Sequence, residues 1–157
     1  MNRKIGAGIA SLALAGMIVG GTTASAFADP LSSKEFKKQA NAICKDGNQQ
    51  IEVAAEQTFG NLPEGQEPSP EQLQTFAAVA IPNTKQQIED VAALQPPKTL
   101  QAKVKKLLTS ARAAVAKVEA DPSLLAAGGK NDPFAATNKQ AKRLGLKECA
   151  GGSNSGS

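Results

Sequence analysis

Apolar residues recur every three or four positions through most of the chain, and polar residues fill the positions between them. This spacing places apolar side chains on one face of an α-helix. It predicts helices over residues 32–58, 69–95, 100–121 and 133–145, and no segment alternates as a β-strand would. The sequence therefore predicts an all-α fold, arranged as an antiparallel four-helix bundle.

The starts of the first two helices carry capping patterns. Ser32 with Glu35 fits a capping box, in which each side chain bonds the other residue's backbone amide. Ser69 is a second N-cap, with Pro70 at the first helical position and Gln72 at the third. These patterns locate both starts along the chain.

Two residues interrupt the helical pattern. Gly47 lies inside the first helix, where glycine costs roughly 1 kcal/mol relative to alanine, and it indicates a close approach by a neighbouring helix. Pro82 lies inside the second helix and lacks the backbone N–H that the helix uses. We therefore expect a kink or a short break near residues 79–81.

The fourth helix has signals at both ends. Asn131 or Asp132 is expected to be its N-cap, with Pro133 at its start. At its end, Gly145 followed by Leu146 predicts a Schellman motif, in which glycine takes a left-handed conformation and the next residue makes an apolar contact.

Residues 1–28 have the features of a secretory signal peptide. Arg3 and Lys4 precede a charge-free apolar run over residues 5–19, and cleavage after either Ala26 or Ala28 fits the small residues that follow. The apolar run is shorter than the ~20 residues needed to cross a bilayer. We therefore expect a secreted or extracytoplasmic protein with no stable membrane anchor after cleavage.

Cleavage after Ala28 would leave a helical domain over residues 29–150 and a Gly/Ser tail over residues 151–157, which we expect to be disordered. The net charge would fall from +4 to +2, because Arg3 and Lys4 leave with the signal peptide. So small a charge, without aromatic side chains interleaved among basic ones, argues against nucleic acid as a partner.

Cys44 lies on the apolar face of the first helix, and Cys149 follows the fourth. In an exported chain with two cysteines, a disulfide is the expected state. It would link the N-terminal helix to the C-terminal segment. The alternative is a redox-active pair, which usually has Cys-x-x-Cys spacing and a group that lowers the thiol pKa. Neither feature is present, so a structural disulfide is favoured.

The chain contains no His, Trp or Tyr. Without histidine there is no Ser-His or Cys-His nucleophile pair and no imidazole metal ligand. Carboxylate pairs such as Glu52 with Glu56 lack a second set of ligands nearby. We therefore expect no catalytic residue, no metal site, no cofactor and no enzymatic activity.

Motifs at the two ends of the domain resemble those of a group of small exported helical proteins of actinobacteria, which have no assigned activity. The matching residues are Phe36, Ala40-Asn41-Ala42-Ile43-Cys44, Asn48, Pro96-Pro97, Asn131-Asp132-Pro133-Phe134, Leu144-Gly145-Leu146-Lys147 and Cys149. The resemblance implies an all-helical fold with Cys44 paired to Cys149, and it supplies no catalytic residue. Some members are lipid-anchored, but this chain has no cysteine at the cleavage site.

Basic residues lie along the last two predicted helices. They are Lys98, Lys105 and Arg112 at heptad spacing, and Lys139, Lys142 and Arg143. If the two basic faces adjoin, they would attract an anionic polymer of the cell envelope or lipid headgroups. The sequence thus favours a non-enzymatic binding module for envelope polymer or another exported protein. The alternatives are a solvated basic face and a structural or accessory protein without a ligand site. The oligomeric state is left open.

Overall fold

The structure is a computed structural model that describes residues 30–127 and 131–151. These residues contain α- and 3₁₀-helices and no β-strand, which confirms the all-α prediction for them. The predicted signal peptide, and the predicted tail beyond Gly151, lie outside the described residues. The α-helices are α1 (Ser33–Phe59), α2 (Pro70–Ala93), α3 (Lys98–Ala120) and α4 (Ala135–Leu144), and the 3₁₀ turns are η1 (Pro122–Leu125) and η3 (Glu148–Ala150).

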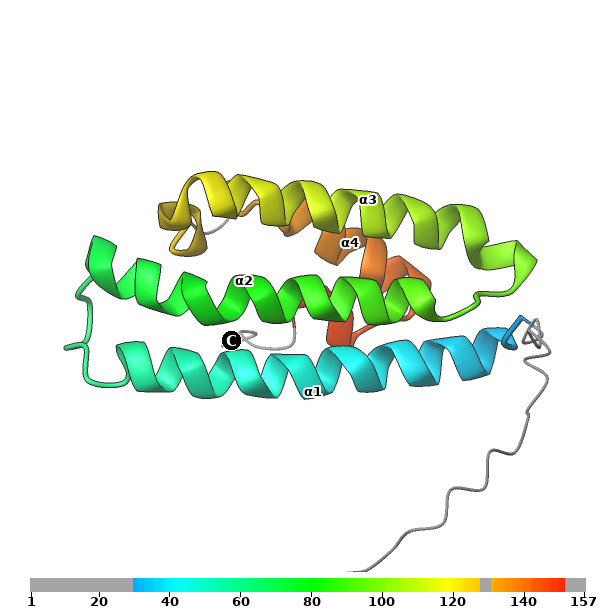
Figure 1. Ribbon diagram of the computed structural model, residues 1–157, viewed down its shortest axis with the longest axis horizontal. Helices are drawn as coiled ribbons and strands as arrows, with labels where there is room; N and C mark the ends of the chain where they lie inside the picture. Colours follow the sequence, from blue (N-terminus) through cyan, green and yellow to red (C-terminus); the bar gives the residue numbers. More distant parts are fainter. Residues whose placement is uncertain (1–29, 128–130, 152–157) are drawn as a thin grey trace, which may run out of the picture.

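The three long helices lie side by side, with α2 between α1 and α3 (Figure 1). The segment that joins α1 to α2 and the segment that joins α2 to α3 are at opposite ends of this row. The shorter α4 packs against α3, and η3 packs against both α1 and α4. The C-terminal segment therefore returns to the helix with which the described chain begins.

The cap of α2 forms as the sequence predicts. The Ser69 hydroxyl accepts from the Gln72 backbone amide at 3.2 Å, and the Gln72 side chain accepts from the Ser69 amide at 2.9 Å. Hydrogen bonds from the Glu71 backbone amide and from the Ser69 side chain lower the pKa of the Glu71 carboxyl. At α1, the Ser32 hydroxyl accepts from the Glu35 amide at 3.1 Å, which confirms Ser32 as the N-cap. The predicted capping box is not completed, because the Glu35 carboxylate accepts from the Ser32 hydroxyl and not from the Ser32 amide. Both starts are thus set by local sequence.

Pro82 does not break α2, which continues as a helix from Pro70 to Ala93. Proline removes the hydrogen bond to the carbonyl oxygen of Ala78, four residues earlier. Both residues are exposed, and a carbonyl oxygen on the solvent side of a helix can tilt outward and bond to water instead. The short break expected near residues 79–81 is therefore absent, whereas a bend of the helix axis stays a prediction.

The predicted start of α4 is wrong by two residues, because the helix begins at Ala135 and not at Pro133. The Asp132 carboxylate accepts from the Phe134 backbone amide at 2.8 Å, and its carbonyl oxygen accepts from the Ala135 amide at 3.2 Å. Asp132 thus closes a separate turn around Pro133 before the helix starts. A polar residue followed by proline fits a turn of this kind as well as a helix cap.

The end of α4 is the predicted Schellman motif. Gly145 has a φ of 76°, its amide donates to the Lys142 carbonyl, and the Leu146 amide donates to the Ala141 carbonyl at 3.0 Å. Leu146 is 0% exposed. The chain therefore turns sharply after α4 and carries Leu146 into the core.

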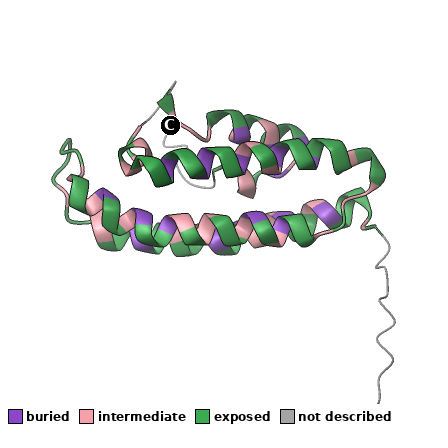
Figure 2. Ribbon diagram, turned by 45° about the horizontal axis from the view of Figure 1, so that its top comes forward, coloured by how far each residue is buried: buried purple, intermediate pink, exposed green. Residues whose placement is uncertain are grey.

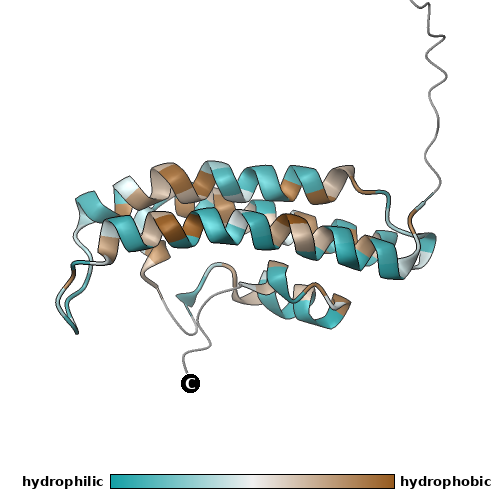
Figure 3. Ribbon diagram, turned by 90° about the horizontal axis from the view of Figure 1, so that it is seen from below, coloured by the Kyte–Doolittle hydropathy of each residue, from teal (hydrophilic) through white to brown (hydrophobic). Residues whose placement is uncertain are grey.

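The core is uneven along the bundle. The larger cluster of buried residues draws on all four α-helices and on the C-terminal segment: Phe36, Ala40, Cys44, Val91, Val104, Leu107, Ala141, Leu144, Leu146 and Ala150. The second cluster has three buried residues, from α2 and α3: Ile88, Ala111 and Val115. Buried residues recur at intervals along the helices in Figure 2, and hydrophobic and hydrophilic residues are interspersed along the two long helices in front in Figure 3. Packing is thus most complete where α4 and the C-terminal segment cover the long helices.

Cys44 and Cys149 form a disulfide across 105 residues of sequence, with their Cα atoms 5.0 Å apart. The predicted link between the N-terminal helix and the C-terminal segment is confirmed. A disulfide indicates an oxidising, extracytoplasmic environment. Among the described helices, none combines the length and the apolar character that a membrane crossing requires.

Replacing both cysteines, as Cys44→Ala with Cys149→Ala, should lower the free energy of unfolding by about 2–5 kcal/mol. The disulfide restricts the unfolded chain over a long loop, and the variant loses that restriction. Urea denaturation of the variant and of the oxidised protein measures the difference. The reduced parent protein should unfold at the same urea concentration as the variant, and a midpoint equal to that of the oxidised protein would contradict the prediction.

Candidate functional site

Three side chains on one flank of α1 hold the C-terminal segment. The Asn41 side chain donates to the Gly145 carbonyl at 3.1 Å and accepts from the Glu148 amide at 3.0 Å. The Asn48 side chain donates to the Glu148 carbonyl at 2.7 Å. Cys44 lies between the two asparagines, at spacings of three and four residues that place all three on the same flank. We call Asn41, Cys44 and Asn48 the α1 clamp.

The basic residues singled out in the sequence are all exposed, but those of α3 do not face α4. The Arg112 guanidinium donates to the Glu89 carboxylate of α2 at 2.9 Å. Lys98 and Lys105 precede Arg112 by two heptads and one heptad, so they share its flank. Ser110, in contrast, accepts at 3.0 Å from the side chain of Gln140 in α4. Two residues correspond to about 200° around a helix, so Arg112 and Ser110 lie on different sides of α3.

Other lysines occupy the flank of α3 next to α4. Lys106 and Lys103 precede Ser110 by four and seven residues, so they lie on its flank. The start of α4 is near the later part of α3, because Phe134 packs against the cluster that contains Ala111 and Val115. Its end is near the earlier part, because Leu144 shares a cluster with Val104 and Leu107. Arg143, three residues after Gln140, therefore lies toward Lys106.

We call Lys103, Lys106, Lys139 and Arg143 the α3–α4 basic surface. All four side chains are exposed, and α4 contains no acidic residue. The one acidic residue of α3, Glu119, is paired with Lys85 of α2. Within residues 30–127 and 131–151 the ion pairs are Lys85–Glu119 and Arg112–Glu89, neither of which involves this surface. Its positive charge is thus not neutralised by carboxylates of the described chain.

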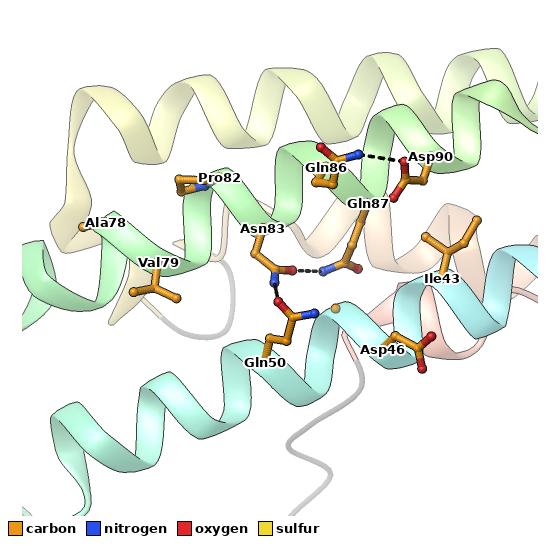
Figure 4. Close-up of a pocket in the computed structure, with 11 residues that line it drawn as sticks. Ile43, Asp46, Gln50, Ala78, Val79, Pro82, Asn83, Gln86, Gln87 and Asp90 are labelled. Carbon is orange, nitrogen blue, oxygen red and sulfur yellow. Dashed lines mark hydrogen bonds between the residues drawn. The ribbon is translucent and has the colours of Figure 1, made fainter. Parts of the chain in front are cut away.

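An open groove of about 560 Å³ runs between α1 and α2 (Figure 4). Side-chain amides span it: Asn83 donates to Gln50 at 2.9 Å, and Gln87 donates to Asn83 at 2.8 Å. Gly47 lies opposite Gln87, whose side chain would overlap a Cβ atom at that position. The space left by the missing Cβ is thus occupied by a side chain of α2, whereas a close approach of the two helix backbones at Gly47 stays a prediction.

The groove offers hydrogen-bonding groups and apolar surface, with Asp46 and Asp90 as its ionisable residues. The Asp90 carboxylate accepts from Gln86 at 2.7 Å (Figure 4). In the part of the chain that the structure describes, no three His, Cys, Asp or Glu side chains are grouped to hold a metal ion.

Comparisons of the chain with protein-family models, with curated proteins and with solved structures found no match. The resemblance to small exported actinobacterial proteins therefore stays a prediction. The residues that carry it gain a structural role, because Asn41, Cys44 and Asn48 of that pattern form the α1 clamp.

Two features of the candidate site could not be predicted from the sequence. The pairing of Arg112 with Glu89 and the contact of Ser110 with Gln140 both depend on how the helices are rotated against one another. One signal for the clamp was present in the sequence. Asn41 and Asn48 lie three and four residues from Cys44, on the same helix flank, and Cys44 was expected to bond to the C-terminal segment.

We expect Asn41→Ala to lower the free energy of unfolding by about 1–3 kcal/mol. The change leaves the Gly145 carbonyl and the Glu148 amide, which are partly buried, without their partner. Urea denaturation gives the stability, and hydrogen exchange at residues 145–149 should become faster.

Gln39→Ala is the matched control, because Gln39 is an exposed amide on the same helix. It should change stability by less than about 0.5 kcal/mol. Equal effects of the two substitutions would show that Asn41 does not hold the segment.

Proposed function

We propose that the protein is an exported, non-enzymatic binding module that engages an anionic polymer of the cell envelope through the α3–α4 basic surface. The observation that carries this proposal is the hydrogen bond between Ser110 and Gln140, which joins the flanks bearing Lys106 and Arg143. Positive charges that meet across a helix pair act together on a polyanion. Lys98, Lys105 and Lys142 extend the positive field around this surface.

The kind of partner follows from what surrounds these charges. They are exposed and form no ion pair with a carboxylate of the described chain, so they attract negative charge within a Debye length of about 8 Å. Few aromatic side chains accompany them, since α3 and α4 contain no Phe, Tyr or Trp, and nucleobase recognition relies on such side chains. A sugar or polyol polymer bearing acidic groups is the partner that this chemistry favours.

The proposal includes export through residues 1–28 as a cleaved signal peptide. The support for it is the disulfide, which belongs in an oxidising compartment, and the charge pattern of the N-terminal sequence. We further propose that the chain is an antiparallel four-helix bundle with α2 bent at Pro82. The opposite placement of the two connecting segments in Figure 1 supports this topology. Membership of the exported actinobacterial group is part of the same proposal.

A second candidate partner is another exported protein, bound at the groove between α1 and α2. Val53 is 52% exposed and Val79 is 46% exposed, and these are the exposed large apolar side chains of the described chain. Val79 lines the groove itself. Apolar surface beside a row of amide groups suits a protein surface better than a polyanion.

The triple variant Lys103→Gln, Lys106→Gln, Arg143→Gln should bind immobilised dextran sulfate about 10- to 100-fold more weakly at low salt. The estimate takes up to about 1 kcal/mol for each lysine or arginine near an anionic surface. Neutral dextran is the control polymer and should retain neither protein. Affinity of the parent protein should fall as NaCl is raised.

The matched control is Lys34→Gln, Lys38→Gln, Lys45→Gln, which removes the same charge from exposed positions of α1. It should retain most of the binding. Equal losses in the two triple variants would mean that net charge alone drives retention, and salt-independent binding would refute the electrostatic mechanism. Failure of both variants and of the parent protein to bind would favour an accessory protein without a ligand site.

A further inference from the structure

The short length of α4 leaves part of the long helices uncovered. At 1.5 Å per residue, the 10 residues of α4 extend about 15 Å, whereas the 23–27 residues of α1, α2 and α3 extend about 35–40 Å. In Figure 1, α4 lies alongside only part of α3. Beyond the start of α4, the long helices enclose a cleft of about 270 Å³ that is open on one side.

The walls of this interior cleft are mostly apolar. They come from all three long helices and from the residue before α4: Ile51, Phe76, Ile81, Val115, Val118 and Phe134. Burying apolar surface against such walls is favourable for any apolar molecule that fits. A cavity of about 150 Å³ lined by aliphatic and aromatic side chains is enough to bind benzene, so this cleft accommodates one or two fused rings.

Polar groups lie on one side of the cleft. Thr84, Gln87, Asn138 and Cys149 line both the cleft and an adjoining cavity of about 80 Å³. The side-chain amide of Asn138 makes no hydrogen bond with another described residue. In the adjoining cavity, Thr137 is 6% exposed and its hydroxyl has no partner within the described chain. A polar group is thus available to a molecule that enters the cleft.

The lining also sets the charge of the ligand. Among the described residues that line the two cavities, Asp132 is the ionisable one, and its carboxylate accepts from the Phe134 amide. No positive side chain of the described lining is present to bind an anion.

We propose that the interior cleft binds a small uncharged apolar molecule with one hydrogen-bonding group, which the side chain of Asn138 recognises. This ligand class differs from the anionic polymer of the proposed function, and the two sites use different residues. A bicyclic aromatic compound with a hydroxyl or amine substituent matches the volume, the walls and the polar side.

The uncharged dye N-phenyl-1-naphthylamine tests the proposal with the oxidised protein. Its fluorescence should rise in a saturable manner with one site per chain. The anionic analogue 8-anilinonaphthalene-1-sulfonate should bind at least tenfold more weakly, because its sulfonate has no counter-charge in the cleft. Absence of saturable binding of the uncharged dye, or equal affinity for both dyes, overturns the proposal.

Ala80→Phe places a ring in the cleft, which Ala80 lines and where it is 5% exposed. It should weaken dye binding at least tenfold, and Ala80→Val, a smaller change, should weaken it by less. Ala92→Phe is the matched control at an exposed position of α2 and should leave affinity within twofold. An equal loss in Ala92→Phe, or no loss in a folded Ala80→Phe and Ala80→Val, contradicts binding in this cleft.

The polar contact has its own test. 1-Naphthol should bind about 3- to 10-fold more tightly than naphthalene, which is the range expected for one hydrogen bond. Asn138→Leu should remove this difference and leave naphthalene binding in place. The triple variant Lys103→Gln, Lys106→Gln, Arg143→Gln should bind the dye as the parent does, so the outcome is independent of polymer binding. An unchanged preference for 1-naphthol in Asn138→Leu would exclude Asn138 as the recognising group.

Discussion

The attachment of the C-terminal segment to α1 is the interaction on which the rest of the structure depends. Asn41 and Asn48 bond the backbone of residues 145–148, and Cys44 ties Cys149 covalently between them. This attachment holds α4 against α3 and brings Leu146 and Ala150 into the larger core cluster. Many buried positions elsewhere are alanines, which contribute little apolar area. The disulfide and these hydrogen bonds thus provide stability that the small buried side chains do not.

Features that depend on neighbouring residues could be predicted from the sequence. The Ser69 cap, the Schellman motif at Gly145 and the apolar faces of the long helices are all encoded within one or two helical turns. The start of α4 was the exception, because Asp132 before Pro133 satisfies the requirements of a turn and of a helix cap alike. The effect of Pro82 on α2 could not be predicted from neighbouring residues either. It depends on whether water can bond to the Ala78 carbonyl oxygen, which loses its hydrogen bond to residue 82.

Features that depend on the rotation of one helix against another could not be predicted. Heptad spacing groups Lys98, Lys105 and Arg112 on one flank of α3, but it gave no indication that Arg112 pairs with Glu89 of α2. The α3–α4 basic surface became identifiable once the contact between Ser110 and Gln140 was known. The interior cleft depends on a difference in helix length and on the position of Phe134, neither of which is apparent from periodicity alone.

The large sequence separation between Cys44 and Cys149 also has a consequence for how the molecule assembles. Contacts between distant parts of a chain form slowly, because the intervening residues lose entropy before the contact is made. The C-terminal segment can bond to Asn41 and Asn48 only after α2, α3 and α4 have been synthesised and have brought it close to α1. Until then Cys44 remains a free thiol on an unpaired helix face, open to mixed disulfides with other thiols. Oxidation is therefore best placed as a late step, one that locks a helical arrangement already formed by local contacts.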